Sequence, residues 1–281
     1  MTRRMFADSL TVNQFAVLIL VLVLVALVIL VVRKLCGRLL QEDSDAILAI
    51  SAAILSVYGL ILGLTMDAAW ERFQIAEFAL RDEANALHAV SRMGVSYDEK
   101  GEALSQAVID YGDAVVEHEL LSKSPQETDK RPASEALYGV YQAMESIGDD
   151  PEYGDLNAVD PTWGVIVDLE NARGTRLQLS QNALPQAFWA VLIFGAVLSI
   201  GGLVVILPAH PALHMVVALG ATGLIVLLLL LINNLDQPYQ GAFTVDFEEF
   251  SNVVDLLRQE QAQVRKGAKL LSTLIDLRRP I

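Results

Sequence analysis

Three long runs without a charged residue constrain the fold of this chain more than any other feature of its sequence. They cover residues 9–32, 46–66 and 177–235. A helix that crosses a lipid bilayer needs about 20 predominantly apolar residues, so the first two runs each hold one such helix. The third run holds two, because Pro208 and Pro211 interrupt it near its middle and proline breaks a helix. The sequence therefore predicts four membrane-spanning helices.

The segments outside these runs have the periodicity of amphipathic helices. From residue 67 the apolar positions recur at helical spacing, which predicts that the second spanning helix continues into water. Further helices are expected over 102–121, 133–147, 161–181 and 247–277, and no segment has a strand pattern. We therefore expect an all-α membrane protein with four parts. These are a first helix pair in 1–66 (about 12–33 and 45–66), a helical domain in 67–184, a second pair in 185–235 (about 186–207 and 212–235), and an amphipathic tail in 236–281.

The distribution of charge predicts how the chain is oriented. The formal net charge is -14, and the acidic excess lies mainly between the second and third spans, which argues against nucleic acid as a partner. The turn between the first two spans carries Arg33, Lys34 and Arg38, and the turn at Pro208 carries no basic residue. The opposite side is richer in basic residues, which include Arg3, Arg4, Arg72, Arg81, Arg173 and Arg176. By the positive-inside rule, both termini and the helical domain are expected in the cytoplasm.

The sequence gives little support to metal, cofactor or enzyme chemistry. Cys36 is the one cysteine, which excludes an intrachain disulfide and a thiolate zinc site. His210 and His214 have a metal-compatible spacing but lack a third ligand in the sequence. No phosphate loop, nucleophile elbow or HExxH motif occurs, so no cofactor and no enzymatic activity are expected. Residues 117–119, Glu-His-Glu, point in three directions around a helix and are expected on a solvated face.

The second apolar run differs from the first in its small residues. They are Ser51, Ala52, Ala53, Ser56, Gly59 and Gly63. Gly59 and Gly63 have the GxxxG spacing that lets two membrane helices approach closely. Two interpretations remain open: ordinary packing against a neighbouring helix, or crowding of this helix around an axis shared with its own copies.

Two motifs resemble the bestrophin family. Leu62-Gly63-Leu64, followed by Trp70-Glu71-Arg72-Phe73 and then Ser91-Arg92, resembles the bestrophin signature at the end of the second membrane helix. Asp236, Pro238 and Gly241 resemble the acidic-x-Pro-Phe-Gly segment after the last membrane helix, where a structural role is expected. Both motifs occupy corresponding places in a four-span plan. The chain is therefore similar to bacterial bestrophin-like membrane proteins, which implies a bacterial inner membrane.

The resemblance implies a homopentamer with a central pore lined by the second helix. The apolar rings of the pore neck would fall at Leu64, Leu60 and Ser56, and Ser56 departs from the bulky apolar residue of the family. Leucine rings would form a hydrophobic constriction that gates by dewetting. The alternative is that Leu60 and Leu64 pack inside a helix bundle.

Asp67 follows Leu64 by one turn and keeps near the same helix face. Copies of Asp67 around an axis would form an anionic ring that favours cations, whereas a single Asp67 could be solvated or paired with Arg72. Glu71 and Arg72 are expected to serve subunit or domain contacts. The isolated acidic residues Asp246, Glu248 and Glu249 do not support calcium activation.

Together these observations favour an oligomeric ion channel that leans towards cations. Its expected partners are the lipid bilayer, copies of itself and inorganic ions. The alternative is a membrane-anchored helical sensor or scaffold that conducts no ions.

Overall fold

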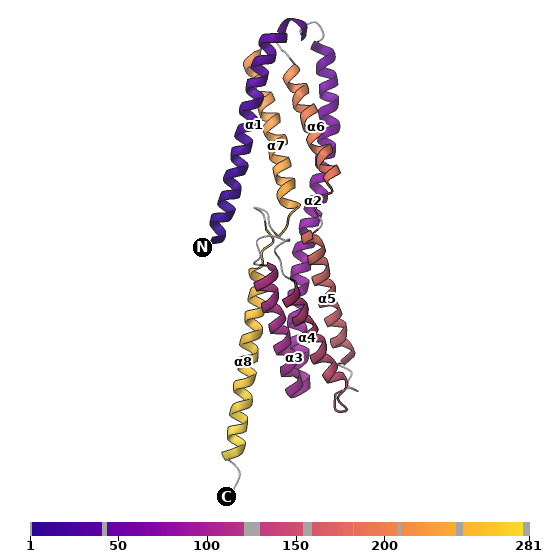
Figure 1. The fold of residues 1–281 in the computed structure, drawn as a ribbon, viewed down its shortest axis with the longest axis vertical. Coiled ribbons are helices and arrows are strands. Elements are labelled where there is room, and N and C mark those ends of the chain that lie inside the picture. Colours follow the sequence, from indigo (N-terminus) through magenta and orange to yellow (C-terminus); the bar gives the residue numbers. More distant parts are fainter. Residues whose placement is uncertain are drawn as a thin grey trace. The chain divides into compact units, whose positions relative to one another are not determined.

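The structure, a computed structural model, describes residues 2–40, 44–120, 130–153, 159–181, 183–206, 210–239 and 244–277. Within these ranges, side chains are described over 13–35, 46–120, 130–153, 159–181, 183–206, 210–239 and 244–267. Every regular element in the described part of the chain is a helix (Figure 1). The chain divides into unit 1, Met1–Gln74 with Asn182–Thr244, and unit 2, Ile75–Gln181 with Val245–Ile281.

In its described residues, unit 1 contains four helices that are long and apolar enough to cross a membrane. They are α1 (Thr2–Leu40), the first part of α2 (Ser44–Gly94), α6 (Gln186–Val205) and α7 (Pro211–Leu235). Figure 1 shows α1, α6 and α7 running alongside this part of α2. The prediction of an all-helical chain with four spans is confirmed.

Prolines set the helix boundaries in the second membrane pair. Pro185 precedes α6, and Pro211 opens α7, where its missing amide hydrogen leaves no intrahelical bond unmade. The interruption predicted near Pro208 and Pro211 is present, since α6 ends at Val205, although Pro208 itself lies outside the described residues. At the other end of α7, the amide of Asp236 donates to the Ile232 carbonyl (2.9 Å) and Pro238 follows. A proline at this place is typical of a helix end.

The core of unit 1 joins α2 to α6 and α7. Its buried members are Tyr58, Leu62, Ala69, Leu192, Ala196, Ile225, Ile232 and Leu235. The Tyr58 hydroxyl donates to the Leu192 carbonyl (3.0 Å), and a Cβ added to Gly195 would overlap the Tyr58 ring. Glycine at position 195 therefore permits the close approach of α6 to α2. A second cluster, formed by Val25, Ile29, Val204 and Ala218, holds α1 against α6 and α7.

The described part of unit 2 consists of the second part of α2 and six further elements. They are η1 (Val95–Tyr97), α3 (Asp98–Ala114), η2 (Val115–Leu120), α4 (Arg131–Gly148), α5 (Val159–Gln181) and α8 (Glu248–Leu277). The turn between α2 and α3 is tight, because a Cβ on Gly101 would overlap the Gly94 carbonyl. Asp98, which begins α3, has a positive φ of 47°.

The tail helix α8 packs within unit 2. Gly112 of α3 leaves room for Val254 of α8, since a Cβ at position 112 would lie 2.6 Å from Val254 Cγ2. Arg258 pairs with Asp113, and Arg265 pairs with Glu102. Apolar contact and exposed ion pairs thus fix α8 on α3.

Candidate functional site

The part of α2 in unit 1 has one exposed face and one buried face. The exposed face carries Ser56, Leu60, Leu64 and Asp67, and the buried face carries Tyr58, Leu62, Thr65 and Ala69. With about 100° between successive residues, the first set falls within an arc of roughly 80° on the side opposite the second. Leu60 is 65% exposed and Leu64 is 64% exposed. They therefore do not pack inside the bundle that unit 1 forms.

The glycines beside this face make no close contact with other described residues of the chain. A Cβ added at Gly59 or Gly63 would meet no atom within 4 Å. The Ser56 hydroxyl donates to the Ala52 carbonyl of its own helix (2.8 Å). Among the described residues, no other part of the chain therefore lies against these two glycines, and their role in helix packing stays a prediction.

The two sequence motifs meet at the end of the membrane helices. Arg72 Nε lies 3.8 Å from Asp236 Oδ1, while Asp67 is exposed. Both carboxylate oxygens of Asp236 accept the Leu184 amide (2.9 and 3.0 Å). Burial raises the pKa of Asp236, and the Leu184 amide and Arg72 only partly offset this rise. The Asp236 carboxylate thus links three segments, which are the end of α7, Leu184 just before α6, and α2.

The other motif residues have simpler surroundings. Trp70 stacks on Phe73 with ring centroids 6.0 Å apart, and Glu71 is exposed. Pro238 is buried, whereas Gly241 lies outside the described residues. The described contacts of this motif are those of packing and helix termination.

Unit 2 contains a buried charge cluster that the sequence analysis missed. The Arg176 guanidinium donates to Glu83 through Nε (2.5 Å) and Nη2 (3.0 Å), and to Glu119 through Nη2 (2.6 Å). Arg173 donates to Glu119 (2.7 Å), and the Tyr111 hydroxyl donates to Glu83 (2.5 Å). The two glutamates and two arginines sum to zero charge, which reduces the cost of burying them.

The electrostatics of this cluster favour the charged arginine and the neutral phenol. Burial alone would lower the pKa of Arg176, but Glu83 and Glu119 raise it well above its ordinary value. Burial, followed by the charge of Glu83, raises the pKa of Tyr111 well above its ordinary value. Arg176 therefore stays charged and Tyr111 stays neutral over the physiological pH range.

Glu119 corrects the expectation of a solvated Glu-His-Glu face. Glu117 is exposed, but Glu119 is buried, because helical spacing places it on the same face as the buried residues Val108, Tyr111 and Val115. The periodicity of the other two helices contained the same signal. Glu83 continues the buried positions 76, 80, 87 and 90 of α2, and Arg173 and Arg176 continue 166, 169 and 172 of α5. Charged residues on an apolar register indicate buried partners.

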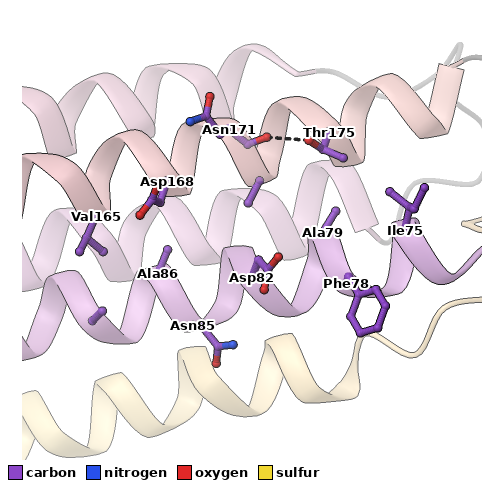
Figure 2. Close-up of a pocket in the computed structure, with 12 residues that line it drawn as sticks. Ile75, Phe78, Ala79, Asp82, Asn85, Ala86, Val165, Asp168, Asn171 and Thr175 are labelled. Carbon is purple, nitrogen blue, oxygen red and sulfur yellow. Dashed lines mark hydrogen bonds between the residues drawn. The ribbon is translucent and has the colours of Figure 1, made fainter. Parts of the chain in front are cut away.

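A groove of about 590 Å³ runs between α2 and α5 in unit 2 (Figure 2). Its lining includes small side chains such as Ala79, Ala86 and Ala172. Asp82 and Asp168 are among its exposed polar residues. Figure 2 also shows the Thr175 hydroxyl donating to the Asn171 carbonyl of its own helix (3.0 Å). The groove is acidic and solvated.

The described side chains offer no obvious metal ligand set. Among the described side chains, no group of three or more His, Cys, Asp or Glu residues is arranged to hold a metal ion. His210 is exposed, and the His214 Nε2 lies 2.9 Å from the Leu203 carbonyl oxygen.

Comparisons with known proteins extend these observations. The bestrophin-like domain family matches residues 19–250. A bacterial bestrophin homologue from Klebsiella pneumoniae, solved as a single-substitution variant, superposes with a TM-score of 0.70 at 14% identity, over 88% of this chain and 98% of that one. Another structure of a bestrophin homologue from the same organism gives 0.69 at 14% identity, over 89% and 97%. The search of curated proteins found no match for the chain.

Proposed function

The chain belongs to the bestrophin-like family, and we propose that it is an oligomeric ion channel of a bacterial inner membrane. In this proposal, copies of α2 surround a central pore, and a pentamer is the arrangement that the family resemblance implies. The observation that carries the proposal is the exposed face of α2, which has no partner in the described part of unit 1. Ser56, Leu60, Leu64 and Asp67 lie on this face.

The composition of this face favours contact with copies of α2 over contact with lipid alone. Between residues 17 and 31, the exposed residues of α1 are all large aliphatic side chains, such as Leu20 (68% exposed) and Leu24. The exposed face of α2 instead includes Ser56, Gly59 and Gly63. Small residues gain nothing from lipid contact, but they allow helix backbones to approach closely.

Leu60 and Leu64 would form the neck of this pore. Rings of leucine in a narrow pore exclude water and so oppose ion passage until the rings move apart. Ser56, one turn before Leu60, would make a wider and more polar ring. Its hydroxyl already bonds to Ala52, so it does not require a further partner.

Asp67 would bias the pore towards cations. Copies of its exposed carboxylate at the end of the neck would form an anionic ring, which raises the local concentration of cations and opposes chloride. The formal net charge of -14 acts in the same direction. With the termini and unit 2 in the cytoplasm, as the basic residues favour, this ring would lie at the cytoplasmic end of the neck.

Ion flux from liposomes that contain the purified protein tests this proposal. Leu60→Ala and Leu64→Ala should change the conductance or its gating, because each replaces a leucine ring by a smaller one. Leu20→Ala is the matched control, since it removes an equally exposed leucine from α1 and should leave the flux unchanged. Unchanged flux in both neck variants would refute the neck assignment. Absence of flux in every protein would favour the scaffold alternative.

A further inference from the structure

We infer that Arg72 and Asp236 are positioning residues that fix the rotation of α2 where it leaves the membrane, and thereby the orientation of the neck leucines. The inference rests on the proposed function, because the neck is part of that proposal. The contact lies outside the exposed face of α2, and neither residue is proposed to meet an ion.

The carboxylate of Asp236 is fixed by the helices around it. Its side chain is 3% exposed, and both of its oxygens accept the Leu184 amide. Asp236 follows the last residue of α7, and its own amide donates to the Ile232 carbonyl. Leu184 precedes Pro185, where α6 begins. The ends of α6 and α7 therefore hold this carboxylate in one place.

Arg72 is the contribution of α2 to this contact. Its Nε lies 3.8 Å from Asp236 Oδ1, and its side chain is 26% exposed. Ala69, three residues earlier, is fully buried and belongs to the same apolar cluster as Ile232 and Leu235. Apolar packing presses α2 against α7, but such contacts tolerate small rotations. The ion pair restricts the rotation of α2, because it requires the Arg72 side chain to face Asp236.

The link to the neck follows from the helix itself. Leu64 and Arg72 are eight residues apart in α2, which contains no proline. Eight residues span about 12 Å of one continuous helix, so a rotation of α2 moves both side chains together. A rotation that turns Leu64 away from the pore axis also turns Arg72 away from Asp236. The pair therefore stabilises one rotational state of the neck.

Removal of Arg72 leaves a buried carboxylate without its cation, which opposes the native rotation. Asp236→Asn keeps the shape of the side chain and an oxygen that accepts the Leu184 amide, but removes the charge. The two substitutions act on one interaction. Their effects should therefore not add in the double variant.

The experiment measures the orientation of α2 without relying on current. In a Cys36→Ala background, Leu64→Cys is labelled with a charged maleimide in the full-length protein in liposomes, and the labelling rate is compared among variants. Arg72→Gln and Asp236→Asn should each change the rate roughly three- to tenfold, and the double variant should match the single ones. Arg72→Lys, which keeps the charge, should lie closer to the native rate. Arg81→Gln removes an exposed ion pair on the same helix and is the control, with no expected change.

Only variants that retain the native thermal unfolding temperature within a few degrees are compared. If Asp236→Asn does not fold, Arg72→Gln and Arg72→Lys still test the pair. Labelling rates that stay native in these variants, or effects that add in the double variant, would overturn the inference. Currents are recorded in parallel. Altered labelling without any native current would support the positioning role and refute the channel. A native current with unaltered labelling and gating would refute the positioning role alone.

Discussion

The two units bury polar side chains in different ways. In unit 1, Gln14 and Asn234 form a neutral pair, with Gln14 Nε2 donating to Asn234 Oδ1 at 2.7 Å, and the buried Asp236 lies just beyond the end of α7. In unit 2, Glu83 and Arg176 are buried together in the helix core. A charged side chain inside a bilayer has no water nearby to solvate it, so burying neutral amides costs less free energy there.

Helix α2 belongs to both units and shows the difference along one element. Its first part exposes Leu60 and Leu64 and buries the hydroxyl of Tyr58 against a carbonyl. Its second part exposes Asp82 and buries Glu83. The comparison teaches that the position of a residue around the helix, rather than its polarity, decides whether its side chain is buried in this chain. A polar side chain can occupy a buried position when another side chain or a carbonyl pairs with it.

The largest expected effect comes from breaking the buried charge cluster. Arg176→Met should destabilise the protein by about 3–5 kcal/mol, because Glu83 and Glu119 would keep their charges without this cation. Arg81→Met is the control, since its ion pairs are exposed and should contribute no more than about 1 kcal/mol. Unfolding of the purified protein in detergent measures both. Equal losses in the two variants would contradict the distinction between buried and exposed pairs.

A smaller effect is expected from adding a methyl group to the membrane helices. Gly195→Ala should destabilise unit 1 by about 1–3 kcal/mol, because the new Cβ would overlap the Tyr58 ring. Gly59→Ala should leave the stability of the single chain unchanged, since its Cβ meets no atom within 4 Å. If copies pack on this face, Gly59→Ala should instead weaken their association, which native mass spectrometry measures. A fully stable oligomer in this variant would argue against close packing at Gly59.

The smallest effect concerns alkaline pH. The unfolded chain loses its tyrosine protons as the pH rises through about 10, whereas native Tyr111 keeps its proton because its pKa is raised. The unfolded state then binds fewer protons, so stability should fall as the pH rises above 10, by up to about 1.4 kcal/mol per pH unit for this group. Tyr141, with its pKa raised to about 12, contributes in the same direction. Tyr111→Phe should therefore reduce the slope of unfolding temperature against pH, and an unchanged slope would contradict the assignment.

Much of the fold could be predicted from local sequence. Charge-free runs and the prolines at 185, 208 and 211 indicate where membrane helices begin and end, since these effects act within a few residues. The meeting of Arg72 with Asp236 could not be derived in this way, although both motifs were visible. It depends on how three helices pack, which local periodicity does not encode.

The buried charge cluster shows what periodicity can and cannot indicate. Glu83, Glu119 and Arg176 all lie on the apolar registers of their helices, which could have indicated buried partners. Which of these residues meet depends on how their helices pack, and local periodicity does not encode that. The proposed pore face of Leu60 and Leu64 was named from the family resemblance, and its exposure in a single chain gives it a physical basis.

The most direct test of the channel proposal is the reversal potential of currents through the purified protein in a bilayer with a salt gradient. We expect a cation-selective current in the native protein and a reversal potential closer to zero in Asp67→Asn, because this substitution removes the anionic ring. An anion-selective current would contradict the role of Asp67 while leaving the fold intact. The absence of current under every condition would contradict the channel itself.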